Sequence, residues 1–147
     1  MHNADLVHCI EALEIHQTVP FHADNSLFEL DLTASNPDLT TDIVSDQVLF
    51  TNWIAAQLHD RNATYGIGGY NEHRTIYSRS THFGIGADEP RRLHLGTDIW
   101  GPAGTPVAAF ADATVHGFGF NGAHGDYGAT IILKYDLGRC AIFALYG

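Results

Sequence analysis

The chain has 147 residues, a length that suits one domain and buries enough surface to fold without disulfides or structural metals. Its formal net charge is −10, and residues 1–60 contain ten Asp or Glu side chains but no Lys or Arg. We therefore expect no nucleic-acid partner. The apolar runs are too short for a transmembrane helix, and the N-terminal residues lack the basic and apolar regions of a signal peptide. These features leave the localisation and the oligomeric state open.

Residues 1–62 are interpreted as an acidic region with one helix and otherwise irregular segments. Apolar and acidic side chains alternate over residues 30–32, which favours a short strand. A helix is predicted to begin after an N-cap at Thr41 or Asp42 and to continue through Leu58. We expect its apolar stripe to pack on the protein core rather than to bind a partner. That stripe consists of Val48, Leu49, Trp53, Ile54 and Leu58.

Residues 63–147 have a different sequence pattern, in which glycines separate short apolar or aromatic segments. This pattern is typical of strands joined by tight turns. Residues 136–139, Asp-Leu-Gly-Arg, suit a hairpin turn between the last two strands. We predict an α+β fold, mainly β, with an antiparallel sheet in residues 63–147 and the helix packed outside it. The strand candidates are Pro106–Phe110, Ala113–Phe120, Ala129–Tyr135 and Cys140–Tyr146.

The segment from His94 to Asp98 has the composition of half a zinc site. A histidine nitrogen and an aspartate oxygen are both good zinc ligands, with bonds of about 2.0–2.2 Å. Four residues of extended strand span about 13 Å, so two side chains on one face would barely reach the same ion. We therefore expect the backbone to bend at Gly96, which has no Cβ to obstruct the bend.

The order of motifs around this segment resembles the M23 family of zinc metallopeptidases, the lysostaphin and LytM type that cuts peptidoglycan cross-bridges. The resemblance covers about residues 91–147 and implies a partial M23-type antiparallel β-sheet core within residues 63–147. It also implies that His94 and Asp98 are the first two zinc ligands, and that peptide or peptidoglycan is the substrate. The matching residues are Arg92, His94-x-Gly-x-Asp98, Gly104-Thr-Pro-Val107, Ala109, Asp112-Ala-Thr-Val115, Asp126-Tyr-Gly128, Ile131-Ile-Leu133 and Leu145-Tyr-Gly147.

The sequence departs from the family pattern after its last matching triplet. In M23 enzymes the tyrosine of this triplet is soon followed by a histidine, and a later His-x-His motif supplies the third zinc ligand and a catalytic histidine. The sequence ends at Gly147 and contains no His-x-His. We therefore expect a truncated peptidase with no catalytic residue within the chain. The expected Zn²⁺ binding is weak or absent, and the expected peptidase activity is negligible.

Four further residues are candidates for substrate contact, each with an ordinary structural alternative. Tyr70 and Arg74 lie in a segment that resembles the lead-in of some M23 proteins, and they could instead pack or form ion pairs. His116 and His124 lie in the β-rich half and could line a peptide groove, or simply be surface or hydrogen-bonded histidines.

Two other functions remain open at this stage. One is a non-catalytic module on the same β-scaffold that binds cell-wall peptide or regulates a hydrolase, because a fold does not guarantee its chemistry. The other is a metal-binding protein in which His94 and Asp98 are completed by a ligand from a partner chain. Sequence downstream of Gly147 would distinguish the first from an enzyme, and a zinc-dependent dimer would support the second.

Overall fold

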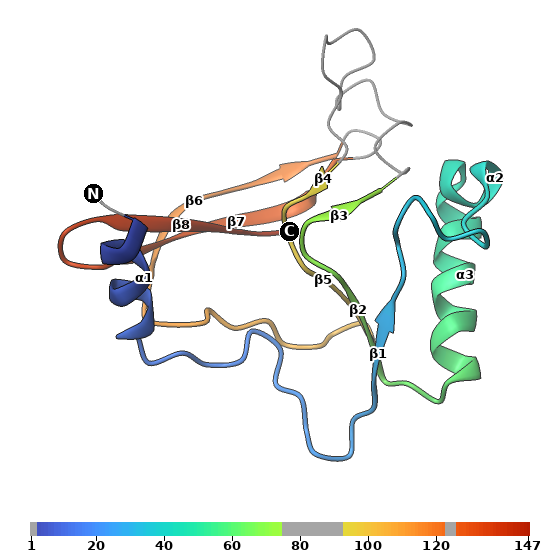
Figure 1. The fold of residues 1–147 in the computed structure, drawn as a ribbon, viewed down its shortest axis with the longest axis horizontal. Helices are drawn as coiled ribbons and strands as arrows, with labels where there is room; N and C mark the ends of the chain where they lie inside the picture. Colours follow the sequence, from blue (N-terminus) through green and yellow to red (C-terminus); the bar gives the residue numbers. More distant parts are fainter. Residues whose placement is uncertain (1–2, 75–92, 123–125) are drawn as a thin grey trace, which may run out of the picture. The chain divides into compact units, whose positions relative to one another are not determined.

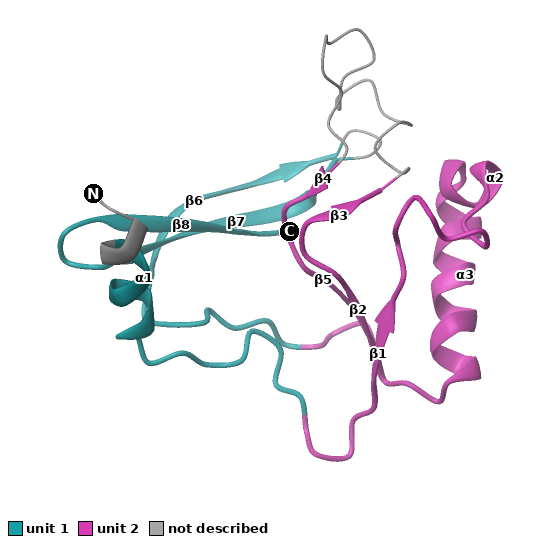
Figure 2. Cartoon of the chain, in the orientation of Figure 1, with its two compact units in different colours: residues 1–21, 106–147 teal, residues 22–105 magenta. Residues whose placement is uncertain are grey.

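The computed structural model describes residues 3–74, 93–122 and 126–147 (Figure 1). The chain divides into two compact units, and Figure 2 colours them separately. Unit 1 contains residues 1–21 and 106–147, and unit 2 contains residues 22–105. This division differs from the change in composition near residue 62, because unit 1 combines the first residues of the chain with its last forty-two.

The helical segment of unit 2 consists of two helices, α2 (Thr41–Ser45) and α3 (Gln47–Asp60), where the sequence predicted one. Asp46 has extended backbone angles and separates them. Its carboxylate accepts hydrogen bonds from the N–H groups of Val48 and Leu49, at 2.7 and 3.0 Å, and so caps α3. The N-cap of α2 is Thr40, one residue before the predicted position.

In the described part of unit 2, five short strands form two small sheets. In the first, β2 (Tyr65–Gly68) lies between β1 (Leu27–Leu30), which runs parallel to it, and β5 (Asp98–Trp100), which runs antiparallel. In the second, β3 (Glu72–His73) pairs antiparallel with β4 (Leu93–His94). The short strand predicted from residues 30–32 lies earlier in the chain: β1 ends at Leu30, and residues 31–32 follow it outside the strand.

The core of unit 2 lies between α3 and the first sheet. Leu30, Leu32 and Ile54 are the buried residues at its centre. Partly buried aromatic rings extend this cluster, and the rings of Phe50 and Trp100 meet edge to face with centroids 5.7 Å apart. Three residues of the predicted stripe, Trp53, Ile54 and Leu58, thus pack on the core. The prediction is wrong for Val48 and Leu49, which are 66% and 46% exposed.

Unit 1 contains an antiparallel sheet in the order β6–β7–β8, formed by Thr114–Asn121, Gly128–Asp136 and Ala141–Tyr146. Three of the four predicted strands and the turn over residues 136–139 are therefore confirmed. Gly138 has a φ of +77°, which suits the tight turn between β7 and β8. Unit 1 also has a helix that the sequence analysis missed, α1 (Asn3–Glu11).

The fourth predicted strand, Pro106–Phe110, is wrong. This segment has no strand ladder, although the N–H of Ala108 donates to the carbonyl of Thr18 at 2.8 Å. The Phe110 carbonyl likewise accepts from the N–H of His16 at 2.7 Å. Isolated bonds of this kind do not make a strand. The Phe110 ring packs by stacking on Tyr135 with centroids 4.0 Å apart, whereas Val107 is 64% exposed.

In the part of the chain that is described, the fold is mainly β with a few helices, as predicted. An M23-type arrangement of the sheet remains an expectation from the resemblance. None of the described helices has the length and apolar character needed to cross a membrane.

Candidate metal site

Two bent segments of unit 2 position the candidate residues. Strands β2 and β3 follow each other through a short turn, and β4 and β5 do the same through a bend. The segments pair with each other, so that Gly68 lies opposite Asp98 and Glu72 lies opposite His94. In the β2–β3 turn Asn71 has a φ of +60°, and its N–H donates to the His94 carbonyl at 2.7 Å. The side chains of both bent segments therefore converge on one region.

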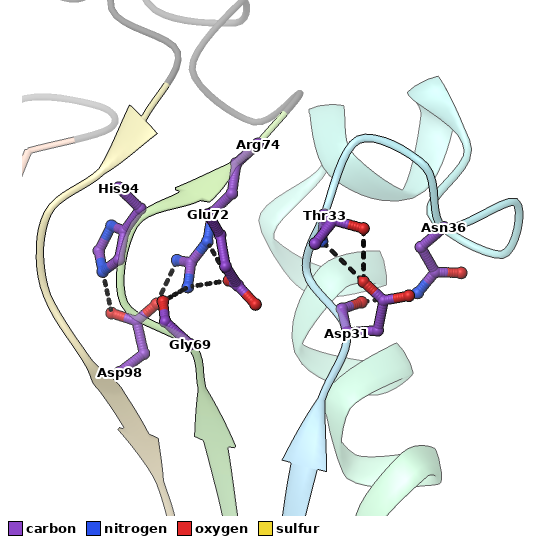
Figure 3. Close-up of polar contacts among 8 residues, drawn as sticks. All are labelled: Asp31, Thr33, Asn36, Gly69, Glu72, Arg74, His94 and Asp98. Atoms are coloured by element: carbon purple, nitrogen blue, oxygen red, sulfur yellow. Dashed lines mark hydrogen bonds and ion pairs between the residues drawn. The ribbon is translucent and has the colours of Figure 1, made fainter.

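His94 and Asp98 are brought together by the predicted bend. The backbone bends at Gly96, between the two strands. As a result Nε2 of His94 lies 3.5 Å from Oδ1 of Asp98 (Figure 3). A Cβ atom added at Gly96 would lie 3.1 Å from the same Nε2, which is tighter than most such contacts. The absence of a side chain at residue 96 therefore leaves room for the imidazole beside the carboxylate.

Arg74 lies on the other side of Asp98 and is the most enclosed member of the cluster. Its side chain is only 5% exposed. Nη1 forms an ion pair with Oδ2 of Asp98, and Nη2 donates to the Gly69 carbonyl at 3.3 Å (Figure 3). Nε donates to Oε2 of Glu72 at 2.8 Å, and Nη2 lies 2.6 Å from the same oxygen. The guanidinium thus bridges two carboxylates and a backbone carbonyl.

Gly68 provides the space for this arginine. A Cβ atom at Gly68 would lie 2.9 Å from Nη2 of Arg74, 3.0 Å from Leu32 and 3.3 Å from the Cβ of Asp98. The backbone leading to this region is held from the β1 side as well. Asp31 accepts hydrogen bonds from Thr33 in the loop after β1, and the N–H of Ala34 donates to the His73 carbonyl at 2.7 Å.

The His94–Asp98 pair has the spacing of two ligands of one tetrahedral ion. Donor atoms about 2.0–2.2 Å from Zn²⁺ lie about 3.3–3.5 Å from each other at tetrahedral angles. The observed 3.5 Å between Nε2 and Oδ1 fits that separation. Within residues 3–74, 93–122 and 126–147, no group of three His, Cys, Asp or Glu side chains is placed to hold a metal ion.

The other predicted site residues are placed as follows. Tyr70 lies in the β2–β3 turn and is 66% exposed. Arg74 is engaged by its neighbours as described, and its predicted contact with substrate is not tested by these bonds. His116 lies on β6 in unit 1, with its ring edge against Phe143 and centroids 4.8 Å apart. His124 lies outside the described residues.

Glu72 is the member of the cluster that the sequence analysis missed. A signal for it was present, because Glu72 and Arg74 are two residues apart in an extended segment and so share one face. A carboxylate and a guanidinium in that spacing can pair locally. The pairing of Arg74 with Asp98 had no such signal, because 24 residues separate the two.

Part of the chain is similar to curated proteins named DD-carboxypeptidase/endopeptidase Mpg from Neisseria meningitidis serogroup B and from Neisseria gonorrhoeae. In each comparison 35% of 81 aligned residues are identical, over 52% of this chain and 18% of the relative. The chain thus matches less than a fifth of the length of these relatives. No family model and no solved structure matches the chain. The similarity is weak and partial, and it is consistent with a peptidase without establishing the M23 family.

Proposed function

We propose that this chain carries part of a zinc-dependent peptidase site of M23 type, whose substrate is a peptide bond of peptidoglycan. The observation that carries the proposal is the 3.5 Å separation of His94 Nε2 and Asp98 Oδ1, which suits two ligands of one zinc ion. The M23 motif order around these residues and the partial similarity to DD-carboxypeptidase/endopeptidases support the same function.

The described residues have separate roles in this proposal. His94 supplies a nitrogen lone pair, and Asp98 supplies Oδ1. When bound at such a site, zinc polarises a substrate carbonyl and lowers the pKa of a bound water. A third protein ligand is required to hold the ion firmly. It would come from residues outside the described part of the chain, from a longer polypeptide or from a partner.

The proposal is tested first by zinc binding. Zinc is titrated into the 147-residue chain while the NMR signals of its histidine side chains are followed, because this readout also detects weak binding. We expect His94→Ala and Asp98→Asn to abolish binding at this site. His116→Ala is the matched control, because His116 is an exposed histidine of the other unit, and it should leave zinc binding unchanged. Equal zinc binding by the wild type and His94→Ala would refute the site.

A second experiment separates catalysis from binding. The chain is incubated with a peptidoglycan cross-bridge peptide, with zinc and with a chelator. With two protein ligands we expect weak zinc binding and negligible cleavage. Sub-micromolar zinc affinity together with cleavage would contradict that expectation and favour a complete enzyme. Peptide binding that persists in the chelator without cleavage would instead favour the alternative, a non-catalytic module that binds cell-wall peptide.

A further inference from the structure

We propose that Arg74 is a positioning residue for Asp98: it holds one carboxylate oxygen so that the other is presented beside His94 as a ligand for a divalent cation. This inference rests on the proposed zinc site and adds a role for a residue that is not itself a ligand. Two ion pairs that share Arg74, one with Glu72 and one with Asp98, would hold the Asp98 carboxylate in place.

The first argument is that the two carboxylate oxygens of Asp98 have different partners. Oδ2 pairs with Nη1 of Arg74, and Oδ1 faces Nε2 of His94 at 3.5 Å. A carboxylate with a free side chain can rotate both oxygens toward a cation. Fixing Oδ2 on a buried guanidinium removes that freedom and directs Oδ1 toward the imidazole. Ligand oxygens of metal sites are commonly held in this way by hydrogen-bonding neighbours.

The second argument is that Arg74 itself cannot move freely. Its planar guanidinium is fixed by Oε2 of Glu72, by the Gly69 carbonyl and by Asp98. Gly68 closes the space on the remaining side, because even a Cβ atom there would lie 2.9 Å from Nη2. A lysine ammonium has neither the planar fork nor this number of directed N–H groups. The arrangement therefore depends on arginine and not only on positive charge.

The third argument concerns charge. A guanidinium next to a metal ligand repels a cation, and alone it would weaken the site. Here Glu72 offsets the charge of Arg74, and its side chain is only 14% exposed. With Asp98 included, the cluster has one more carboxylate than it has guanidinium groups. Arg74 can therefore position Asp98 while the site keeps a net negative charge that attracts a divalent cation.

The test measures zinc affinity in the full chain by the same NMR titration. Loss of a group that holds a metal ligand typically weakens metal binding by about 10–100-fold. We expect a loss in this range for Arg74→Gln. Because the largely enclosed carboxylate of Glu72 would then lack its partner, the double variant Glu72→Gln/Arg74→Gln is measured as well. It removes the charges of both Glu72 and Arg74 and leaves only Asp98, which is 34% exposed, without its ion pair. It should therefore fold, and it should show the same loss of affinity.

A further variant distinguishes positioning from a general effect of charge. Arg74→Lys keeps the charge and loses the fork, so we expect it to bind zinc nearly as weakly as Arg74→Gln does. Wild-type zinc affinity in Arg74→Lys, or in the folded double variant, would overturn the proposal.

The His94→Ala result separates this inference from the proposed function. If His94→Ala binds zinc as well as the wild type, there is no zinc site at His94 and the proposed function fails. If His94→Ala loses zinc binding and the folded Arg74 variants keep it, the zinc site stands and only the positioning role is wrong. Circular dichroism and thermal unfolding of each variant establish that the protein titrated is folded.

Discussion

The imidazole of His94 and the carboxylate of Asp98 lie 3.5 Å apart, Nε2 to Oδ1, although four residues of extended strand would span about 13 Å. The bend that brings them together occurs at Gly96, and the two short strands on either side pair with different parts of the neighbouring segment. The spacing of the pair is therefore produced by the local path of the backbone, which makes it sensitive to small changes at the bend.

Gly96→Ala tests this sensitivity. Its added Cβ would lie 3.1 Å from Nε2 of His94, so the imidazole must shift by a few tenths of an ångström. The φ angle of Gly96 is not positive, so alanine should not strain the backbone itself. We expect the shift to weaken zinc binding by about tenfold, at the lower end of the range for displaced ligands. Zinc titration followed by the His94 signals measures it.

Gly117→Ala is the matched control for that substitution. Gly117 lies in β6, its φ is not positive, and an added Cβ would meet no heavy atom within 4 Å. This variant should bind zinc as the wild type does. If Gly96→Ala and Gly117→Ala bind zinc equally well, the space beside His94 does not determine the affinity of the site.

The sequence predicted the parts of the fold that depend on local pattern. The strands β6, β7 and β8 were located to within a residue or two, because alternating apolar residues and glycine turns mark them directly. The break at Asp46 was missed, because helical spacing continues across it and only its capping role separates the two helices. Pro106–Phe110 was predicted as a strand from its apolar residues, but a strand also needs a partner along its length.

For the candidate site, the sequence pattern identified His94 and Asp98 by residue type and spacing, but it could not reveal which neighbours hold them. The need for a bend at Gly96 followed from the reach of two side chains, and the structure has that bend. The ion pair between Arg74 and Asp98 depends on the pairing of β2 with β5, which places Gly68 opposite Asp98. Because that register is a tertiary property, the sequence indicated Arg74 only as a candidate for substrate contact, with packing or ion pairing as the alternative, and did not identify Asp98 as its partner.

Asp46→Ala should destabilise unit 2, because Asp46 accepts two N–H groups at the start of α3. Loss of such an N-cap typically costs about 0.5–2 kcal/mol, and we expect about 1 kcal/mol here. Chemical denaturation monitored by circular dichroism measures the loss. Thr40→Ala is the comparison, because the Thr40 hydroxyl accepts one N–H at 3.4 Å and caps a helix of five residues. Equal losses in the two variants would contradict the role assigned to Asp46.

Tyr135 should make the stability of the protein depend on pH at alkaline values. Tyr135 is fully buried, and its hydroxyl lies 2.6 Å from that of Tyr146. Burial, and then the hydrogen bond to Tyr146, raise the pKa of Tyr135 well above its ordinary value. The folded state therefore retains a proton that the unfolded state loses above about pH 10. This contribution to stability is complete below pH 10 and declines as pH rises toward the folded-state pKa.

Tyr135→Phe separates this effect from other alkaline transitions. At neutral pH the variant should lose about 0.5–1.5 kcal/mol of unfolding free energy, because the hydrogen bond to Tyr146 is absent. Above pH 10 the wild type should lose stability more steeply than the variant, so the difference between them shrinks. Denaturant titrations from neutral to strongly alkaline pH measure both quantities. Tyr70→Phe is the control, because Tyr70 is 66% exposed. It should change the unfolding free energy at neutral pH by less than about 0.5 kcal/mol, and that free energy should fall with rising pH as it does in the wild type. If the unfolding free energy of Tyr135→Phe falls above pH 10 as steeply as that of the wild type, the alkaline loss of stability comes from other groups.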